Sequence, residues 1–71
     1  MENQDVRYLT EVQVSRLTGL AVPTLRNQRH LGRGIPYIKL KRAVRYNSQD
    51  VLSFMESRKV IPHNVILSET A

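Results

Sequence analysis

The first amphipathic stretch of the chain begins beside a helix-capping signature. The Thr10 side chain can accept a hydrogen bond from the backbone of the residue three positions on, and Gln13 can return that bond. Val14 and Leu17 supply an apolar stripe, and Gly19 suits the left-handed conformation that ends a helix. We therefore expect a short helix from about residue 11 to residue 19.

A second helix is expected from residue 22 to residue 30 or 31. Pro23 is tolerated only in the first turn of a helix, which places the start just before it. At about 100° per residue, Leu25 and Gln28 face one side, with Ala21 before them, and this side is expected to meet the core. The polar Gln28 does not suit such a position. Two short helices joined by a tight Gly-containing turn form a helix-turn-helix.

A β-hairpin is expected after the second helix. Gly32 and Gly34 are interpreted as the helix cap and a hinge, and residues 37–40 and 43–46 alternate with period two around Lys41-Arg42. This turn lacks the Gly or Asn that two-residue hairpin loops prefer. The alternation places one apolar set on one face, namely Ile38, Leu40, Val44 and Tyr46, and Lys39 and Arg45 on the other.

A third helix and a tail complete the expected organisation. Ser48 can cap the helix, and Val51, Leu52, Phe54 and Met55 recur at helical spacing up to about residue 58. The chain is thus divided into an N-terminal arm (1–7), one α+β domain (8–59) and a flexible tail (60–71). The tail holds an apolar patch at residues 65–67 that could add a strand to a partner.

The distribution of charged residues indicates what kind of partner this domain binds. The 71 residues hold 11 Lys+Arg and 6 Asp+Glu, a net charge of +5, and no acid lies between Glu11 and Asp50. The intervening segment carries eight cations: Arg16, Arg26, Arg29, Arg33, Lys39, Lys41, Arg42 and Arg45. Such a self-repelling stretch favours a polyanionic partner, of which nucleic acid is the commonest, over a basic surface that serves solubility alone.

Composition removes several other function classes. With no Cys and two His, the chain has no ordinary metal-ligand set, and no cofactor is expected. No nucleophile elbow or glycine-rich phosphate loop is present, so neither catalysis nor a small-molecule substrate is expected. The polar start of the chain does not resemble a signal peptide, and no apolar run reaches the roughly 18 to 20 residues of a membrane span. The expected location is cytoplasmic.

The second helix presents the residue types that read DNA bases. Pro23, Arg26, Asn27 and His30 fall on its exposed side. Arg can bond guanine, Asn can bond adenine, and His can donate to a base or a phosphate. Thr24 can donate its hydroxyl to a phosphate beside the helix N-terminus. The alternative is a polar surface that only meets water.

Two further sets of cations lie beside that surface. Arg29 is close to the buried side of the second helix, where it can tie the helix to the hairpin or to a phosphate. The hairpin is expected to project Lys39, Lys41, Arg42 and Arg45 from its exposed face and tip toward phosphates or a minor groove. The alternative is a basic edge that discourages strand pairing.

The order and spacing of short motifs over residues 8–59 resemble a known family. The motifs are Leu9-Thr10-Glu11, Leu17-Thr18-Gly19-Leu20, Thr24-Leu25-Arg26-Asn27, residues 32–40 (GRGIPYIKL), Val44-Arg45-Tyr46 and Asp50-Val51. They are similar to the small winged helix-turn-helix proteins of the excisionase and AlpA-like group, which are related to the DNA-binding domain of MerR regulators. This chain has Gln28 where the family usually has Trp or another apolar residue, Ala21 where Ser commonly caps, and Lys41 where Gly usually turns the wing.

The resemblance implies that the second helix enters the major groove and that the hairpin is the wing. Base contacts would then fall to Arg26, Asn27 and His30, and backbone contacts to Thr24, Lys39, Arg42 and Arg45. The expected function is sequence-specific binding of double-stranded DNA, by an excisionase-like recombination directionality factor or a small transcriptional regulator. Its expected partners beyond DNA are an integrase or further copies of itself on adjacent sites.

Two rival functions stay open at this stage. One is a protein-interaction module of the antitoxin or anti-repressor type. It would bind its partner through the tail and through the third helix, which holds Val51, Phe54 and Met55. The other is binding to RNA or to an anionic membrane surface, which the same basic charge would serve.

Overall fold

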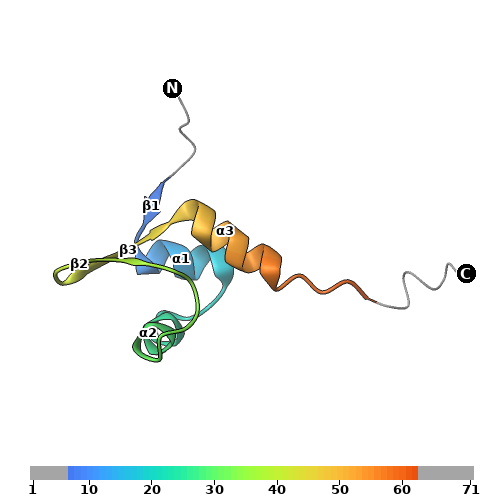
Figure 1. The fold of residues 1–71 in the computed structure, drawn as a ribbon, viewed down its shortest axis with the longest axis horizontal. Coiled ribbons are helices and arrows are strands. Elements are labelled where there is room, and N and C mark those ends of the chain that lie inside the picture. The colour runs from blue at the N-terminus through green and yellow to red at the C-terminus, as the bar shows by residue number, and fades with distance from the viewer. Residues whose placement is uncertain (1–6, 63–71) are drawn as a thin grey trace, which may run out of the picture.

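The computed structural model describes residues 7–62, which form three helices and three strands. In chain order these are β1 (Tyr8–Leu9), α1 (Glu11–Thr18), α2 (Val22–His30), β2 (Ile38–Leu40), β3 (Ala43–Asn47) and α3 (Ser48–Ser57). The strands form one antiparallel sheet in the order β1-β3-β2 (Figure 1). The expected α+β class is confirmed, whereas the apolar patch at 65–67 and most of the expected arm lie outside the described residues.

Helix α1 begins and ends where its local signals predict. The Thr10 hydroxyl accepts from the Gln13 backbone at 3.2 Å, and the Gln13 side chain accepts from the Thr10 backbone at 2.9 Å. Gly19 closes the helix at φ +82°, a left-handed conformation that glycine adopts without steric cost. The apolar stripe is narrower than expected, because Val14 is buried but Leu17 is exposed.

Helix α2 also has the expected bounds, with Pro23 in its first turn. It ends in a Schellman motif: the Gly32 backbone N–H donates to Arg29, and the Arg33 N–H donates to the Gln28 carbonyl at 2.9 Å. Leu25 is buried as predicted. Ala21 lies at the N-cap position and is exposed, so its predicted place against the core is wrong.

The hairpin forms around Lys41-Arg42, but the predicted assignment of its faces is wrong. In the observed register Ile38 lies opposite Arg45 and Lys39 lies opposite Val44. Residues directly opposite one another share a face of the sheet, so Lys39 joins Val44 on the inner face. Ile38 joins Arg45 on the outer face, and Leu40, 56% exposed, shares that side.

Helix α3 is capped by Asn47 and not by Ser48 as predicted. The Asn47 side chain accepts from the Gln49 backbone N–H at 2.8 Å. Ser48 is the first helical residue, and it binds Arg7 twice: its hydroxyl accepts from the Arg7 backbone N–H at 3.0 Å, and its own N–H donates to the Arg7 carbonyl at 2.7 Å. These bonds fasten the N-terminal end of β1, a strand that the sequence pattern did not predict, beside β3.

One small core joins the elements. Its buried residues are Val14 of α1, Leu25 of α2, Ile35 of the connecting loop, Tyr46 of β3 and Val51 of α3. Leu9, Leu20, Val44 and Phe54 are partly buried against them. Of the apolar residues predicted for α3, Leu52 and Met55 are exposed. A core with one buried residue from each helix, one from β3 and one from the connecting loop fixes the position of α2 beside the hairpin.

Gln28 occupies the core-facing position predicted for it, although its side chain is polar. Its Oε1 atom is buried and has no hydrogen-bond partner among the described residues. Gly34, at φ +91°, lies directly over it, and a Cβ at that position would come within 2.6 Å of Oε1. Gly34 is therefore required both by its backbone conformation and by its closeness to Gln28.

Replacing Gln28 with Met is expected to raise the free energy of unfolding by about 1 kcal/mol, because it removes a buried unpaired oxygen while keeping the side-chain length. Urea denaturation measures this change. Gln49→Met, at an exposed position of α3, is the control and is expected to stay within about 0.5 kcal/mol of the wild type. A destabilised Gln28→Met variant would show that the amide is satisfied in solution.

Candidate functional site

One face of α2 carries the polar residues predicted for it. Pro23, Thr24, Arg26, Asn27 and His30 are all exposed, whereas Leu25 between them is buried. No side chain caps the N-terminus of α2, so the backbone donors of its first turn are not satisfied by a capping residue. This face therefore offers hydrogen-bond donors and acceptors along its length and the positive end of a helix dipole at its start.

A cleft between α2 and the hairpin continues this surface. We call it the basic furrow, lined by Arg26, Arg29, His30, Tyr37, Lys39, Arg42 and Val44. A second cleft shares Arg26, Arg29, Arg42 and Val44 with it and extends to Thr10 and Glu11 at the start of α1. Lys39 reaches the furrow because the observed register places it on the inner face of the hairpin. The structure thus brings cations of α2 and of the hairpin together.

Arg29 connects α2 to the hairpin, one of the two roles predicted for it. Its Nη1 donates to the Tyr46 hydroxyl at 2.7 Å. Its guanidinium carbon lies 5.7 Å from the centre of the Tyr37 ring and 5.9 Å from that of Tyr46, within range of cation–π attraction. Only 16% of the Arg29 side chain is exposed. Arg29 is therefore mainly a structural residue of the furrow wall.

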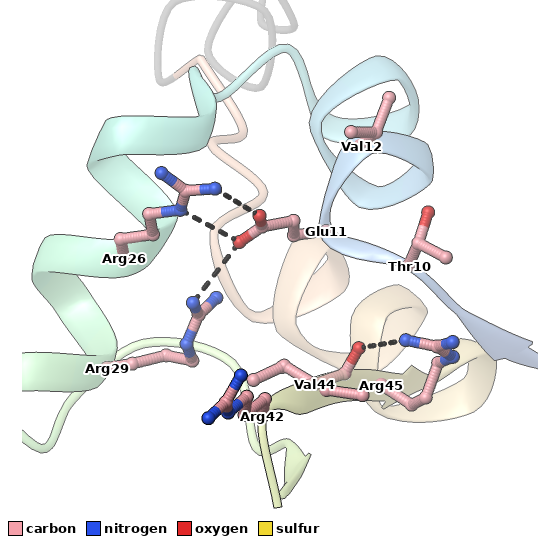
Figure 2. Close-up of a pocket in the computed structure, with 9 residues that line it drawn as sticks. Thr10, Glu11, Val12, Arg26, Arg29, Arg42, Val44 and Arg45 are labelled. Carbon is pink, nitrogen blue, oxygen red and sulfur yellow. Dashed lines mark hydrogen bonds and ion pairs between the residues drawn. The ribbon is translucent and has the colours of Figure 1, made fainter. Parts of the chain in front are cut away.

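Glu11 is the residue of the site that the sequence did not reveal. Figure 2 shows its carboxylate between the two arginines of α2. It accepts from Arg26 Nε at 3.2 Å and from Arg26 Nη2 at 2.6 Å, and Arg29 Nη2 donates to it at 3.2 Å. The available sequence signal was that Glu11 is the last acid before the long acid-free segment.

These contacts shift the pKa values of all three groups. The hydrogen bond from Arg26 is the main reason that the pKa of Glu11 lies below its ordinary value of 4.5, although burial opposes the shift. The same bond raises the pKa of Arg26. Burial acts to lower the pKa of Arg29, but hydrogen bonds to Tyr46 and Glu11 outweigh it and the net shift is upward. All three groups are charged at neutral pH.

The remaining hairpin candidates differ in where they point. Arg42 lines the furrow, and Lys41 is exposed at the tip of the turn. Arg45 lies on the outer face opposite Ile38, and its Nη1 donates to the Val44 carbonyl at 2.8 Å. In Figure 2 its side chain extends away from Arg26, Arg29 and Arg42. The structure therefore gathers Lys39 and Arg42 with α2 in the furrow. Arg45 lines the second cleft and not the furrow, and its guanidinium is directed away from the arginines of α2.

Within residues 7–62, no three His, Asp or Glu side chains gather as metal ligands would. No helix in the same part of the chain has the length and apolar character needed to cross a bilayer. Comparisons with protein-family models, with curated proteins and with solved structures find no match to this chain. The arrangement of the site residues is therefore the basis for a functional proposal.

The stability of the domain is expected to depend on the ionisation of Glu11. Because folding lowers its pKa, this carboxylate contributes stability above pH 4.5, and the contribution is lost as the pH falls through the lowered value. Thermal unfolding at a series of pH values measures this effect. The stability difference between the wild type and Glu11→Gln is expected to shrink below pH 4.5, and a difference that stays constant there would contradict the assignment.

Lys41 at the hairpin tip is expected to cost stability. Its φ of +56° makes it the one non-glycine residue with positive φ in the described part of the chain. Lys41→Gly is expected to raise the free energy of unfolding by about 0.5–1 kcal/mol, since the relief of strain exceeds the added freedom of the unfolded chain. Lys41→Ala keeps the Cβ atom and is expected to give no gain. Equal stability of the two variants in urea denaturation would rule this explanation out.

Proposed function

We propose that this domain is a winged helix-turn-helix that binds double-stranded DNA with sequence preference. The observation that carries the proposal is the juxtaposition of an exposed polar face on α2 with the cations of the hairpin across the basic furrow. In this arrangement α2 lies in the major groove and the hairpin of β2 and β3 lies against the backbone as the wing.

The exposed side chains of α2 suit the edges of base pairs. Arg26 can bond guanine through two donors, Asn27 can bond adenine with its amide, and His30 lies one turn further along. Thr24 and the uncapped N-terminus of α2 suit a phosphate at the edge of the groove. Leu25 anchors this helix in the core, so the reading face has a fixed orientation.

The hairpin supplies charge and not sequence information. Lys39 and Arg42 face the furrow, and Lys41 extends the positive charge to the tip of the turn. Neutralising phosphates releases condensed counterions, which makes affinity fall steeply with salt. For four to seven phosphate contacts, the logarithm of the binding constant is expected to fall with the logarithm of salt concentration with a slope of roughly −4 to −6.

A single domain of this size offers a small DNA interface, so tight binding requires adjacent copies on repeated sites or a second protein such as an integrase. This requirement suits an excisionase-like directionality factor and also a small transcriptional regulator. For the rival, an interaction module that binds through α3 and the tail, Val51 is buried and Phe54 packs against the core, so Leu52 and Met55 are the exposed apolar residues of α3. Residues 63–71 of the tail lie outside the described residues.

The decisive test is selection of bound duplexes from a random DNA library with the full chain. An enriched sequence is expected, with the steep salt dependence stated above. Failure to enrich any sequence, or an affinity for duplex DNA that is insensitive to salt, would remove the proposal. Structured RNA and acidic vesicles at equal salt serve as competing ligands, and a preference for either would favour the corresponding rival.

Arg26→Ala is expected to weaken binding to the selected duplex about tenfold to a hundredfold and to relax specificity at one base pair. Fluorescence anisotropy with the selected duplex and its single-base variants measures both effects. Arg16→Ala removes an equally charged, exposed residue from α1 and is expected to change affinity less than threefold without altering base preference. Equal effects of the two substitutions would exclude Arg26 from base recognition.

A further inference from the structure

Glu11 places a negative charge beside the surface proposed to meet DNA. It is the first residue of α1, and the capping pair of Thr10 and Gln13 fixes the start of that helix. Its side chain is only 22% exposed and lies against α2 and not in open solvent. A carboxylate at this place repels the phosphates of any duplex, so it opposes binding that does not depend on sequence.

The same carboxylate holds one edge of the Arg26 guanidinium. Its two bonds to Arg26 use Nε and Nη2, at 3.2 Å and 2.6 Å, and Nη1 is not part of them. The Arg26 side chain is still 62% exposed, and Figure 2 shows its remaining terminal nitrogen directed away from Glu11. An arginine held in this way loses less conformational freedom when it meets a base than one that moves freely.

Glu11 is itself held from the other side. Arg29 donates to it at 3.2 Å and to the buried Tyr46 hydroxyl at 2.7 Å. The orientation of the Arg26 guanidinium is thus linked, through Glu11 and Arg29, to a core residue of β3. Such indirect support from the core is what a precisely placed recognition residue requires.

From these contacts we infer that Glu11 is a specificity-determining positioning residue, an inference that rests on the proposed DNA binding. It orients Arg26 toward one base and lowers affinity for duplexes that lack that base. The role differs from a purely structural link between α1 and α2, because it predicts a change in the ratio of affinities for two duplexes and not only in stability.

The test measures dissociation constants of the full-length variants for the selected duplex and for a shuffled duplex of the same composition. Glu11→Gln is expected to bind the shuffled duplex about threefold to tenfold more tightly, because a repelling charge is lost, and to reduce the affinity ratio about tenfold. Glu11→Asp keeps the charge but shortens the side chain. It is expected to reduce the ratio while leaving affinity for the shuffled duplex within twofold of the wild type.

Two controls separate positioning from charge and from folding. Glu56→Gln removes the same charge from α3, where Glu56 pairs with Lys59 at 3.0 Å, and is expected to leave the ratio unchanged. In an Arg26→Ala background, Glu11→Gln is expected to have no further effect on the ratio, since Glu11 acts through Arg26. Circular dichroism melts establish that each variant is measured below its unfolding transition.

The outcomes distinguish this inference from the proposed function. If the wild type prefers the selected duplex and the Glu11 variants have the same ratio of affinities for the two duplexes as the wild type, the inference alone is overturned. Tighter binding of Glu11→Gln to both duplexes by the same factor also overturns it, because Glu11 would then act only as a repelling charge. A wild type that binds both duplexes equally overturns the proposed function and this inference with it.

Discussion

The buried hydroxyl of Tyr46 is the constraint on which both the core and the candidate site depend. Its ring is among the most deeply buried groups of the domain, and a buried hydroxyl without a partner costs about 1–3 kcal/mol. Arg29 supplies that partner from α2 at 2.7 Å. Bringing the Arg29 guanidinium into a largely buried position creates a second requirement, a compensating negative charge, and Glu11 meets it from α1. One chain of contacts therefore joins β3, α2 and α1.

This chain of contacts matters more here than it would in a larger domain. The core holds few side chains, so apolar packing alone gives each pair of elements little contact. The bond between Arg29 and Tyr46 adds a directional link between α2 and the hairpin, and Gly34 over Gln28 adds a close backbone approach in the connecting loop. Together they hold the hairpin and its connecting loop against α2. The proposed contact with a DNA backbone depends on such a fixed arrangement of α2 and the hairpin.

The parts of the fold that the sequence predicts correctly are those decided by local interactions. The Thr10–Gln13 pair and Gly19 act over three or four residues, so the bounds of α1 could be predicted from the sequence. Pro23 in the same way predicted the start of α2. The faces of the hairpin were predicted wrongly from the alternation of residue types, although a two-residue turn at Lys41-Arg42 by itself places Lys39 opposite Val44. The pairing of Leu40 with Ala43 is decided by the turn and by packing against the core, not by the alternation of residue types.

The same distinction applies to the candidate site. The exposed face of α2 followed from helical spacing around Leu25, which depends on a single helix. The contacts of Glu11 join residues 15 and 18 positions apart on two helices, and no spacing rule relates such positions before the helix packing is known. What the sequence does contain is the solitary position of Glu11 at the border of the acid-free segment. A lone acid beside many cations gains most where it contacts two of them at once, and the packing of α1 on α2 provides that place.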